Sequence, residues 1–462
     1  MENSVDLAVK TVEYATSIGA SYCDVRLEEA KTTSLRVSKG SLEASGSSSV
    51  TGLGIRVLVD GSWGFVSTEV LEWDRIKEAV LKAYKLAKSS SKRKLKKVKI
   101  AEAKPVKTRV KGNIKKDPLN IPIEEKVKLV MDVDKVLREY SLVKDDRVRY
   151  GDVSYRKIIA TSEGSEIIIE GSRIRMVIYT VAKKNGILSP AYDLIAKSMG
   201  FEIFKKYDPF KRAKKVAERS SRLVDAPVPK GGLKTVVLDN DLIGMIVHEA
   251  FGHTAEADHV IAGTVLSGKI GEKVGAETVT IVDSPGPSYS YGWTPYDDEG
   301  VEGRDVVIVE KGILREYMQN RETAAETGMN LTGNGRAENY GYAPLVRMRT
   351  TYMDKGDWSP EEIIEDTRDG FYLVKSLHGQ SDMNGVFMFV VQEAWEIKNG
   401  ELVRPYRGVT LSGNSIEALL NIDAVGKDLV LDSPGMCGKL QWVPVDGGGP
   451  HVRTRLMVGG ER

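Results

Sequence analysis

The chain has 462 residues, which is too long for one hydrophobic core, so two or three domains are expected. No run approaches the roughly 18 apolar residues of a membrane span, and this excludes an integral membrane protein. The net charge of +2 gives no overall attraction for nucleic acid or for a membrane surface. The first ten residues, MENSVDLAVK, lack a basic region followed by an apolar stretch, so no secretory signal is expected.

Cysteine and histidine are both scarce. The two cysteines, Cys23 and Cys437, are separated by most of the chain, which excludes a disulfide framework and favours a reducing, cytoplasmic location. Of the five histidines, two fall within six positions of each other with a glutamate between them. Composition alone therefore makes that cluster conspicuous.

Residues 1–90 predict a small α+β unit. An amphipathic helix over 4–18 ends at Gly19, and helical spacing returns over 73–88. Between them, β-forming residues alternate or cluster among Gly and Ser turns. The expected strands cover residues 22–28, 33–38, 50–59 and 62–67.

Residues 91–120 are interpreted as a basic linker. The stretch 92–116 holds twelve Lys or Arg against one Glu, with Pro105 and Gly112 inside it. Such a run fits either a patch for an anionic partner or a solvated strap between domains. Aromatic residues for base stacking are not interleaved with the charges, so the strap is favoured and a nucleic-acid partner is not expected.

A second unit at 121–225 has the same order of elements as the first. Helices are expected over 122–140 and about 206–223, with strands near 147–159, 164–170 and 173–182. From 226 to 462 the sequence is glycine-rich and mostly strand and turn, with short helices near 241–254, 321–328 and 414–420. The predicted fold class is α+β: two small helix-plus-sheet units, then a large β-rich C-terminal domain carrying one short metal-binding helix.

The segment from His248 to His253 has the residue types of a metallopeptidase helix. In the usual zinc motif two His four residues apart share a metal, while a Glu between them, here Glu249, activates water. Here the second His is five residues on, which puts the two rings roughly 140° apart on an ideal helix. A single-turn π-bulge absorbs one extra residue, and Gly252 is where the backbone could most easily distort. The alternative interpretation is a buried helix with two unrelated histidines.

A catalytic zinc normally takes three protein ligands and leaves a fourth position open, so one donor is missing. Glu256 and Asp258 follow His253 too closely to fold back onto the same metal unless the helix ends at once. His378 and His451 fit surface or structural roles better. The candidates for the third ligand are Glu256, Asp258, His259, His378, His451 and Cys437.

Cys437 lies in a turn-rich loop, Ser433–Lys439, with glycine on both sides. A thiol there has the backbone freedom to approach a metal, and Lys439 nearby would favour the thiolate. Cys23, within a predicted strand of the first unit, is expected to be an inert small side chain.

These motifs resemble the TldD/PmbA family of zinc metallopeptidases, specifically its catalytic TldD-like branch. The resemblance extends over most of the chain. Its sharpest parts are His248–His253, Tyr296–Gly300, Pro344–Thr350, Pro434–Lys439 and the final Met457–Gly460.

The resemblance implies one Zn²⁺ per active site, held by His248, His253 and Cys437, with Glu249 as the general base. It also implies N-terminal, middle and C-terminal parts, the last β-rich and carrying the site. Family members cut small or unstructured peptides in extended form, and many pair with a paralogue that lacks the metal residues. A dimer with such a paralogue or with a second copy is therefore expected. The residues that bind substrate are not indicated.

Two other functions fit parts of the sequence. A dipeptidyl-peptidase-like enzyme also uses His-Glu-x-x-Gly-His, but takes a Glu as third ligand from a second helix in a largely helical lobe. The β-rich surroundings and Cys437 argue against it. A non-catalytic regulator of nucleic-acid enzymes could use the basic strap, and its DNA binding would then be salt-sensitive and independent of Glu249.

Overall fold

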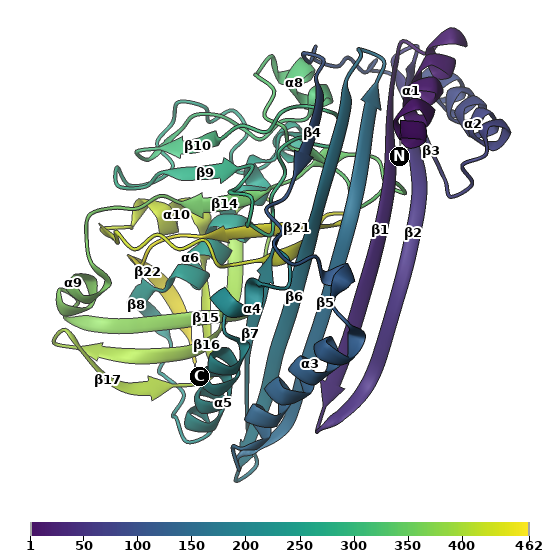
Figure 1. Ribbon diagram of the computed structural model, residues 1–462. Helices are drawn as coiled ribbons and strands as arrows, with labels where there is room; N and C mark the ends of the chain where they lie inside the picture. Colours follow the sequence, from purple (N-terminus) through teal and green to yellow (C-terminus); the bar gives the residue numbers. More distant parts are fainter. Residues whose placement is uncertain (1, 461–462) are drawn as a thin grey trace.

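The computed structural model describes residues 2–460, and its mixed α+β fold confirms the fold class expected from the sequence (Figure 1). A sheet of long strands runs along one side of the molecule, and the β-rich C-terminal part packs beside it. Among the described residues, no helix combines the length and the apolar character needed to cross a membrane.

The long sheet has seven strands in the order β3-β2-β1-β5-β6-β4, with β7 also paired to β6. The two N-terminal units therefore share one sheet, because β1 of the first pairs antiparallel with β5 of the second. The strands are β1 Tyr22–Ser38, β2 Ser41–Val59, β3 Ser62–Thr68, β4 Lys107–Lys111, β5 Val143–Thr161, β6 Glu166–Lys184 and β7 Ile187–Lys197.

Several of these strands are longer than the sequence pattern predicts. The strands expected at 22–28 and 33–38 are one, β1, and those expected at 164–170 and 173–182 are one, β6. Gly171 makes no turn, because the pairing of β6 with β5 continues through it. A Cβ at this position would lie 2.5 Å from the hydroxyl oxygen of Tyr155. The glycine instead lets that ring cross the strand. Strand β7 was not predicted at all.

Helices cover parts of this sheet. They are α1 Glu2–Ser17, α2 Trp73–Ser91, α3 Ile123–Arg138, α4 Ile203–Lys206 and α5 Pro209–Leu223, with a 3₁₀ turn, η1, at Pro118–Asn120. The single helix predicted at 206–223 is divided into α4 and α5. Asp208 caps α5 by accepting a hydrogen bond from the Phe210 N–H at 2.9 Å, and Pro209 starts the helix.

The basic stretch 92–116 contains a strand that the linker interpretation missed. Strand β4 pairs in parallel with β6, and its cations meet carboxylates of that strand. Lys107 lies 2.6 Å from Glu166, and Arg109 lies 2.6 Å from Glu170. This part of the segment therefore belongs to the sheet.

The C-terminal part contains two larger sheets and a two-stranded ribbon, β12-β13. One larger sheet has the order β11-β10-β9-β14-β21-β20, and the other has the order β15-β8-β22-β18-β16-β17, with β19 paired to β22. The strands are β8 Gly232–Leu238, β9 Ile281–Ser284, β10 Val306–Glu310, β11 Ile313–Leu314, β12 Gly335–Arg336, β13 Leu345–Val346, β14 Thr350–Met353, β15 Asp369–Ser381, β16 Val386–Lys398, β17 Glu401–Tyr406, β18 Val409–Asn414, β19 Ala424–Val425, β20 Gly435–Gly438, β21 Trp442–Gly448 and β22 Val452–Gly459.

Short helices connect these strands, including two, α7 and α9, that the sequence analysis did not predict. They are α6 Asn240–Met245, the π-helical turn η2 Ile246–Gly252, the 3₁₀ turn η3 His253–Ala255, α7 Ala257–Ala262, α8 Arg321–Thr327, α9 Pro360–Glu365 and α10 Ser415–Leu420.

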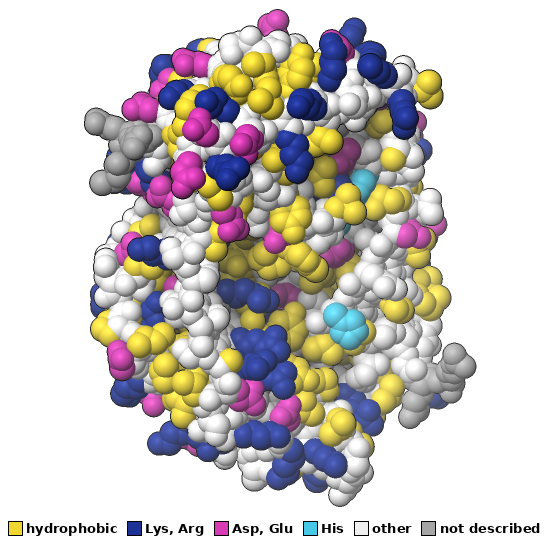
Figure 2. Space-filling model, turned by 90° about the vertical axis from the view of Figure 1, so that its right-hand side faces the viewer, with side chains coloured by type: hydrophobic (Ala, Val, Ile, Leu, Met, Phe, Trp, Pro, Cys, Tyr) yellow, Lys and Arg dark blue, Asp and Glu magenta, His cyan; other side chains and the backbone are white. Residues whose placement is uncertain are grey.

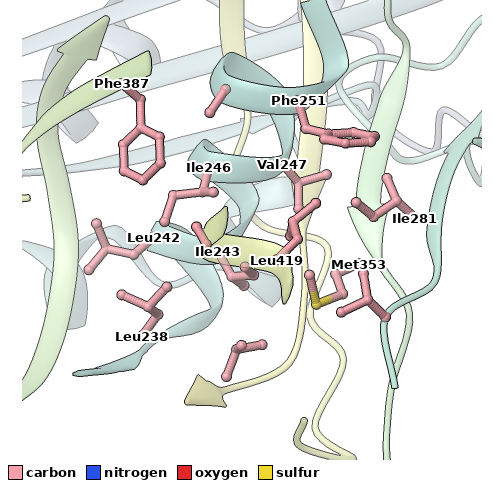
Figure 3. Close-up of a cluster of buried hydrophobic side chains, with 14 of the residues drawn as sticks. Leu238, Leu242, Ile243, Ile246, Val247, Phe251, Ile281, Met353, Phe387 and Leu419 are labelled. Atoms are coloured by element: carbon pink, nitrogen blue, oxygen red, sulfur yellow. The ribbon is translucent and has the colours of Figure 1, made fainter. Parts of the chain in front are cut away.

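The segment α6–η2 is embedded in the largest hydrophobic core (Figure 3). Its apolar side chains meet residues from both large sheets, including Ile281 and Met353 of one and Phe387 of the other. Asp239 caps α6 by accepting a hydrogen bond from the Leu242 N–H at 2.9 Å. The helix that carries the two histidines is therefore fixed on several sides by packing.

Buried ion pairs join the long sheet to the C-terminal part. Arg56 of β2 lies 2.6 Å from Asp24 and 2.8 Å from Glu299, and each of the three side chains is at most 5% exposed. Lys157 of β5 lies 2.5 Å from Asp298. Breaking such a pair leaves a charge without compensation in the interior.

We predict that Arg56→Met lowers the free energy of unfolding by about 3–5 kcal/mol, because it leaves Asp24 and Glu299 buried without their shared cation. The matched control is Arg36→Met, which breaks the exposed pair with Glu43 and should cost less than about 1 kcal/mol. Thermal and urea unfolding of both variants measure the difference. Equal stability of the two variants would contradict this role for Arg56.

Candidate metal centre

The extra residue between the two histidines is absorbed by a π-helical turn, as the spacing predicts. In η2 the backbone N–H of His253 donates to the carbonyl of His248, five residues earlier. The two imidazole rings then lie with their centroids 5.2 Å apart and their planes at 80°. A widened turn therefore puts both rings on one side of the helix.

Gly252 was expected to allow a distorted backbone, but the structure gives a different reason for glycine at this position. Its φ of −58° and ψ of −47° are ordinary helical values, so the backbone does not require glycine there. A Cβ at this position would instead collide with the sulfur of Met348. The missing side chain gives the segment after β13 room to pack against η2.

The fold brings Cys437 to the two histidines, although it lies 184 residues beyond His253. Its Sγ is 3.2 Å from the Nε2 of His253, and the donor atoms of His248, His253 and Cys437 all lie within 4.8 Å of one another. Cys437 comes from β20, the last strand of its sheet. All three residues are enclosed, with His248 8% and Cys437 4% exposed.

Glu256 orients the ring of His253. Its fully buried carboxylate lies 3.0 Å from the Nδ1 of His253. A carboxylate at Nδ1 leaves Nε2, the atom that faces Cys437, as the free donor nitrogen, which is the usual arrangement behind a metal-bound histidine. The sequence analysis considered Glu256 only as a ligand, and its distance from the other two donors could not be read from the spacing.

Two cations, one fully buried and one partly buried, hold the β20–β21 hairpin against the histidine segment. Lys439 lies 3.0 Å from Glu256 and 2.7 Å from Asp258. Arg347, which is fully buried, donates from Nη2 to the carbonyl of Cys437 at 2.5 Å. Arg347 lies in the Pro344–Thr350 segment that resembles the family, but no role was predicted for it, and Lys439 was expected only to favour the thiolate.

The electrostatic environment favours a thiolate at Cys437. Burial alone would raise the pKa of this thiol. The imidazoles of His248 and His253 have the larger, opposite effect, so that the pKa lies well below its ordinary value. Burial lowers the pKa of His253, but Glu256 and Cys437 outweigh it and raise that pKa well above its ordinary value. The site therefore stabilises a negative sulfur by means of adjacent positive charge, which a bound cation would also provide.

Glu249 borders the donor set without being part of it. Its Oε2 lies 4.0 Å from the Nε2 of His253, and its side chain is 30% exposed, more than any of the three donors. Its backbone carbonyl accepts a hydrogen bond from Ser381 Oγ, which ties η2 to β15. The carboxylate is therefore placed between the donor set and solvent.

The remaining candidates for a third ligand lie elsewhere or have other partners. His378 is exposed on β15, and the Nδ1 of His451 lies 2.7 Å from Asp428. His259 lies near His253 and Glu256, and these three could also hold a cation. That second group would use Nδ1 of His253, which already faces a carboxylate engaged by Lys439. Cys23 is buried in β1 of the long sheet and belongs to neither group of possible metal donors among the described residues.

The donor set fits zinc. Zn–S and Zn–N bonds of about 2.3 and 2.0–2.1 Å at a tetrahedral angle imply an S···N separation of about 3.6 Å. The observed 3.2 Å between Cys437 Sγ and His253 Nε2 needs only a small adjustment. Imidazole nitrogen and thiolate sulfur are both zinc ligands, and three protein donors are the number that a catalytic zinc site takes.

Fold and donor set together define a β-rich protein with a candidate His–His–Cys metal centre on a π-helical turn. Residues 230–460 match the family model described as the PmbA/TldA metallopeptidase C-terminal domain. Residues 23–87 and 116–224 match domain 1 and the central domain of the same family. The chain therefore belongs to the PmbA/TldD family of metallopeptidases.

Full-length relatives agree with this assignment. A metalloprotease from Methanocaldococcus jannaschii is 39% identical over 98% of this chain and 100% of its own length. A zinc metalloprotease TldD homolog from Saccharolobus solfataricus is 32% identical over 98% of this chain and 99% of its own.

Solved structures share the fold at lower identity. TldE from Thermococcus kodakarensis has a TM-score of 0.80 at 20% identity and covers 98% of this chain and 99% of its own. A candidate modulator of a DNA gyrase from Thermotoga maritima has a TM-score of 0.81 at 22% identity, with the same coverage. Identities this low show the fold alone.

We predict that Cys437→Ser weakens zinc binding by more than about 100-fold, because loss of a ligand should exceed the 10–100-fold effect of losing an outer partner. The matched control is Cys23→Ser, which should leave zinc content unchanged. Zinc per chain after dialysis against a competing chelator measures both. Full zinc retention by Cys437→Ser would contradict the ligand assignment.

We predict that Glu256→Gln lowers zinc affinity by about 10–100-fold with the fold intact, because the amide no longer fixes His253 through a charged hydrogen bond. A chelator competition titration checks the affinity, and near-UV circular dichroism checks the fold. An affinity equal to that of the unaltered protein would show that Glu256 does not position the ring.

Proposed function

We propose that this protein is a zinc-dependent peptidase that hydrolyses small or unstructured peptides bound in extended form. The observation that carries the proposal is the convergence of His248, His253 and Cys437 from segments 184 residues apart, with the carboxylate of Glu249 on the solvent side. The names of the full-length relatives support the same class of activity.

In this proposal His248, His253 and Cys437 would hold one Zn²⁺, which would supply Lewis acidity and make a nearby water more acidic. Glu249 accepts the proton of the attacking water and then donates it to the leaving amine. Glu256 keeps the His253 ring in the orientation that exposes Nε2. Arg347 and Lys439 keep Cys437 in place while substrate binds and leaves.

An extended substrate is supported by the position of β20. This strand ends its sheet, so no other strand of residues 2–460 pairs with the edge opposite β21. A peptide added along such an edge is held mainly by main-chain hydrogen bonds, which gives weak selectivity for side chains. Folded substrates cannot present an extended segment there, so they should be spared.

We also propose that the protein works as a dimer, with a second copy or with a paralogue that lacks the metal residues. Exposed apolar side chains beside the metal site support this, among them Leu440 at 94% and Trp442 at 57% exposure. Multi-angle light scattering of the purified chain distinguishes a homodimer from a monomer that awaits a different partner. The cytoplasm remains the location we propose.

The test of the mechanism is Glu249→Gln. Because Glu249 is assigned as base and not as ligand, this variant should keep its zinc but lose at least about 100-fold in the rate of cleavage of an unstructured fluorogenic peptide. Removal of zinc by a chelator should abolish activity in the unaltered protein, and zinc should restore it.

Three other results would contradict the mechanism. Full activity of Glu249→Gln would exclude it as the base, and loss of zinc with an intact fold would make it a ligand. A zinc-loaded, unaltered protein that cleaves no peptide would favour a non-catalytic binding role instead.

A further inference from the structure

A cavity of about 370 Å³ lies between the long sheet and the C-terminal part, apart from the metal site. Strands β1, β5 and β6 form one wall, and strands β12, β20 and β21 with loops of the C-terminal part form the other. Its volume lies in the range of small-molecule sites, about 300–1,000 Å³. The aromatic side chains that line it are Tyr155, Tyr291, Trp293 and Tyr296.

Two arginines in this cavity lack a carboxylate partner. Among the side chains described, those of residues 4–460, no carboxylate lies within 4.0 Å of the guanidinium of Arg173 or Arg336. Arg336, only 4% exposed, donates to two backbone carbonyls, those of Met348 and Pro444. These bonds use two of its five N–H groups.

Arg173 is held more loosely. Its guanidinium lies 4.7 Å from the centroid of the Tyr155 ring, and its Nη2 makes one long hydrogen bond, 3.5 Å, to the carbonyl of Trp293. Its Nε is buried without an acceptor. Burial, together with the positive charges of Arg173 and Arg347, lowers the pKa of Arg336 to about 9. The positive charges of the two arginines therefore repel each other, and the attraction of Asp298, which also lines the cavity, only partly offsets this effect on Arg336.

The acidic side chains of the cavity are engaged elsewhere. Glu28 and Asp298 lie 3.4 and 2.5 Å from Lys157, and Glu29 lies 3.7 Å from Arg156. Glu338 accepts a hydrogen bond from the Trp442 backbone N–H at 2.6 Å. None of them neutralises Arg173 or Arg336 at hydrogen-bonding distance, so an external anion is the partner that the cavity lacks.

The cavity borders a groove and adjoins the β20–β21 hairpin that carries Cys437. An open groove of about 620 Å³ along the long sheet shares Tyr155 and Arg156 with it. On β20, Met436 lines the cavity while the next residue, Cys437, faces the histidines, because successive side chains of a strand point to opposite faces. Figure 2 shows Lys and Arg side chains gathered beside a hollow on one face of the molecule.

We propose that this cavity binds the C-terminal residue of a peptide: Arg173 and Arg336 hold its carboxylate, and the aromatic rings surround its side chain. A guanidinium matches a carboxylate with two parallel hydrogen bonds, and a buried aromatic wall suits an apolar side chain. The rest of the peptide passes in extended form along the edge of β20, whose Met436 lines the cavity. The inference deepens the proposed peptidase function, on which it rests, by giving the enzyme a preference for free chain ends.

The test measures binding without turnover, in the full-length Glu249→Gln protein loaded with zinc. The first two probes are a fluorescein-labelled Ala-Ala-Ala-Ala-Phe peptide with a free C-terminal carboxylate and the same peptide as its amide. The third is an Ala-Ala-Glu-Ala-Phe amide, which carries a carboxylate only on a side chain. Fluorescence anisotropy gives each dissociation constant.

The free acid should bind at least about tenfold more tightly than its amide, the effect of a charge-assisted hydrogen bond. Adding Arg173→Gln should reduce this preference to within about twofold, and Arg173→Lys, which keeps the charge but not the fork, should reduce it partly. The matched control is Arg149→Gln, an exposed arginine on β5 outside the cavity, which should keep the full preference.

Equal binding of acid and amide, or an unchanged preference in Arg173→Gln, would overturn the proposal. Tight binding of the glutamate-containing amide would reassign the site to acidic side chains and overturn its assignment to chain ends. The outcome is separate from that of the peptidase test. A protein that prefers the free acid but cleaves nothing supports this site and contradicts the peptidase, whereas cleavage without that preference overturns this inference alone.

Discussion

The five-residue spacing of His248 and His253 is the constraint on which the rest of the centre depends. On an ideal helix the two rings would diverge, so the turn between them must widen, and in η2 it does. A π-helical turn is rare and gains little from its own hydrogen bonds, and here it is buried in the core between two sheets, where Val247 and Phe251 are fully buried. Packing therefore stabilises a backbone that local preference alone would not.

A second requirement is to keep a distant thiol beside those rings. Cys437 sits on an edge strand, which by itself is poorly fixed. Two cations supply the restraint: Arg347 donates to the cysteine carbonyl, and Lys439 joins the hairpin to the carboxylates of Glu256 and Asp258. Glu256 in turn fixes His253. One connected network of charges thus positions two of the three donors, and losing any member should loosen the others.

The sequence was most informative where the signal is local. The His-Glu-x-x-Gly-His run and its need for a widened turn follow from spacing alone. The approach of Cys437 followed only from the family resemblance, since the residues themselves left six candidates open. The roles of Glu256 and Arg347 depend on tertiary contacts that no spacing encodes. Strand β4 escaped notice because its alternation is formed by Lys and Arg, whose partners lie across the sheet on β6.

The central claim is that one zinc is bound by two imidazoles and one thiolate. Zinc K-edge X-ray absorption of the full-length protein, loaded with one equivalent of zinc, tests it most directly. Such a site gives a single sulfur at about 2.3 Å and two imidazole nitrogens at about 2.0–2.1 Å, with one light atom completing the shell. A shell without sulfur, or one fitted by nitrogen and carboxylate oxygen alone, would contradict it.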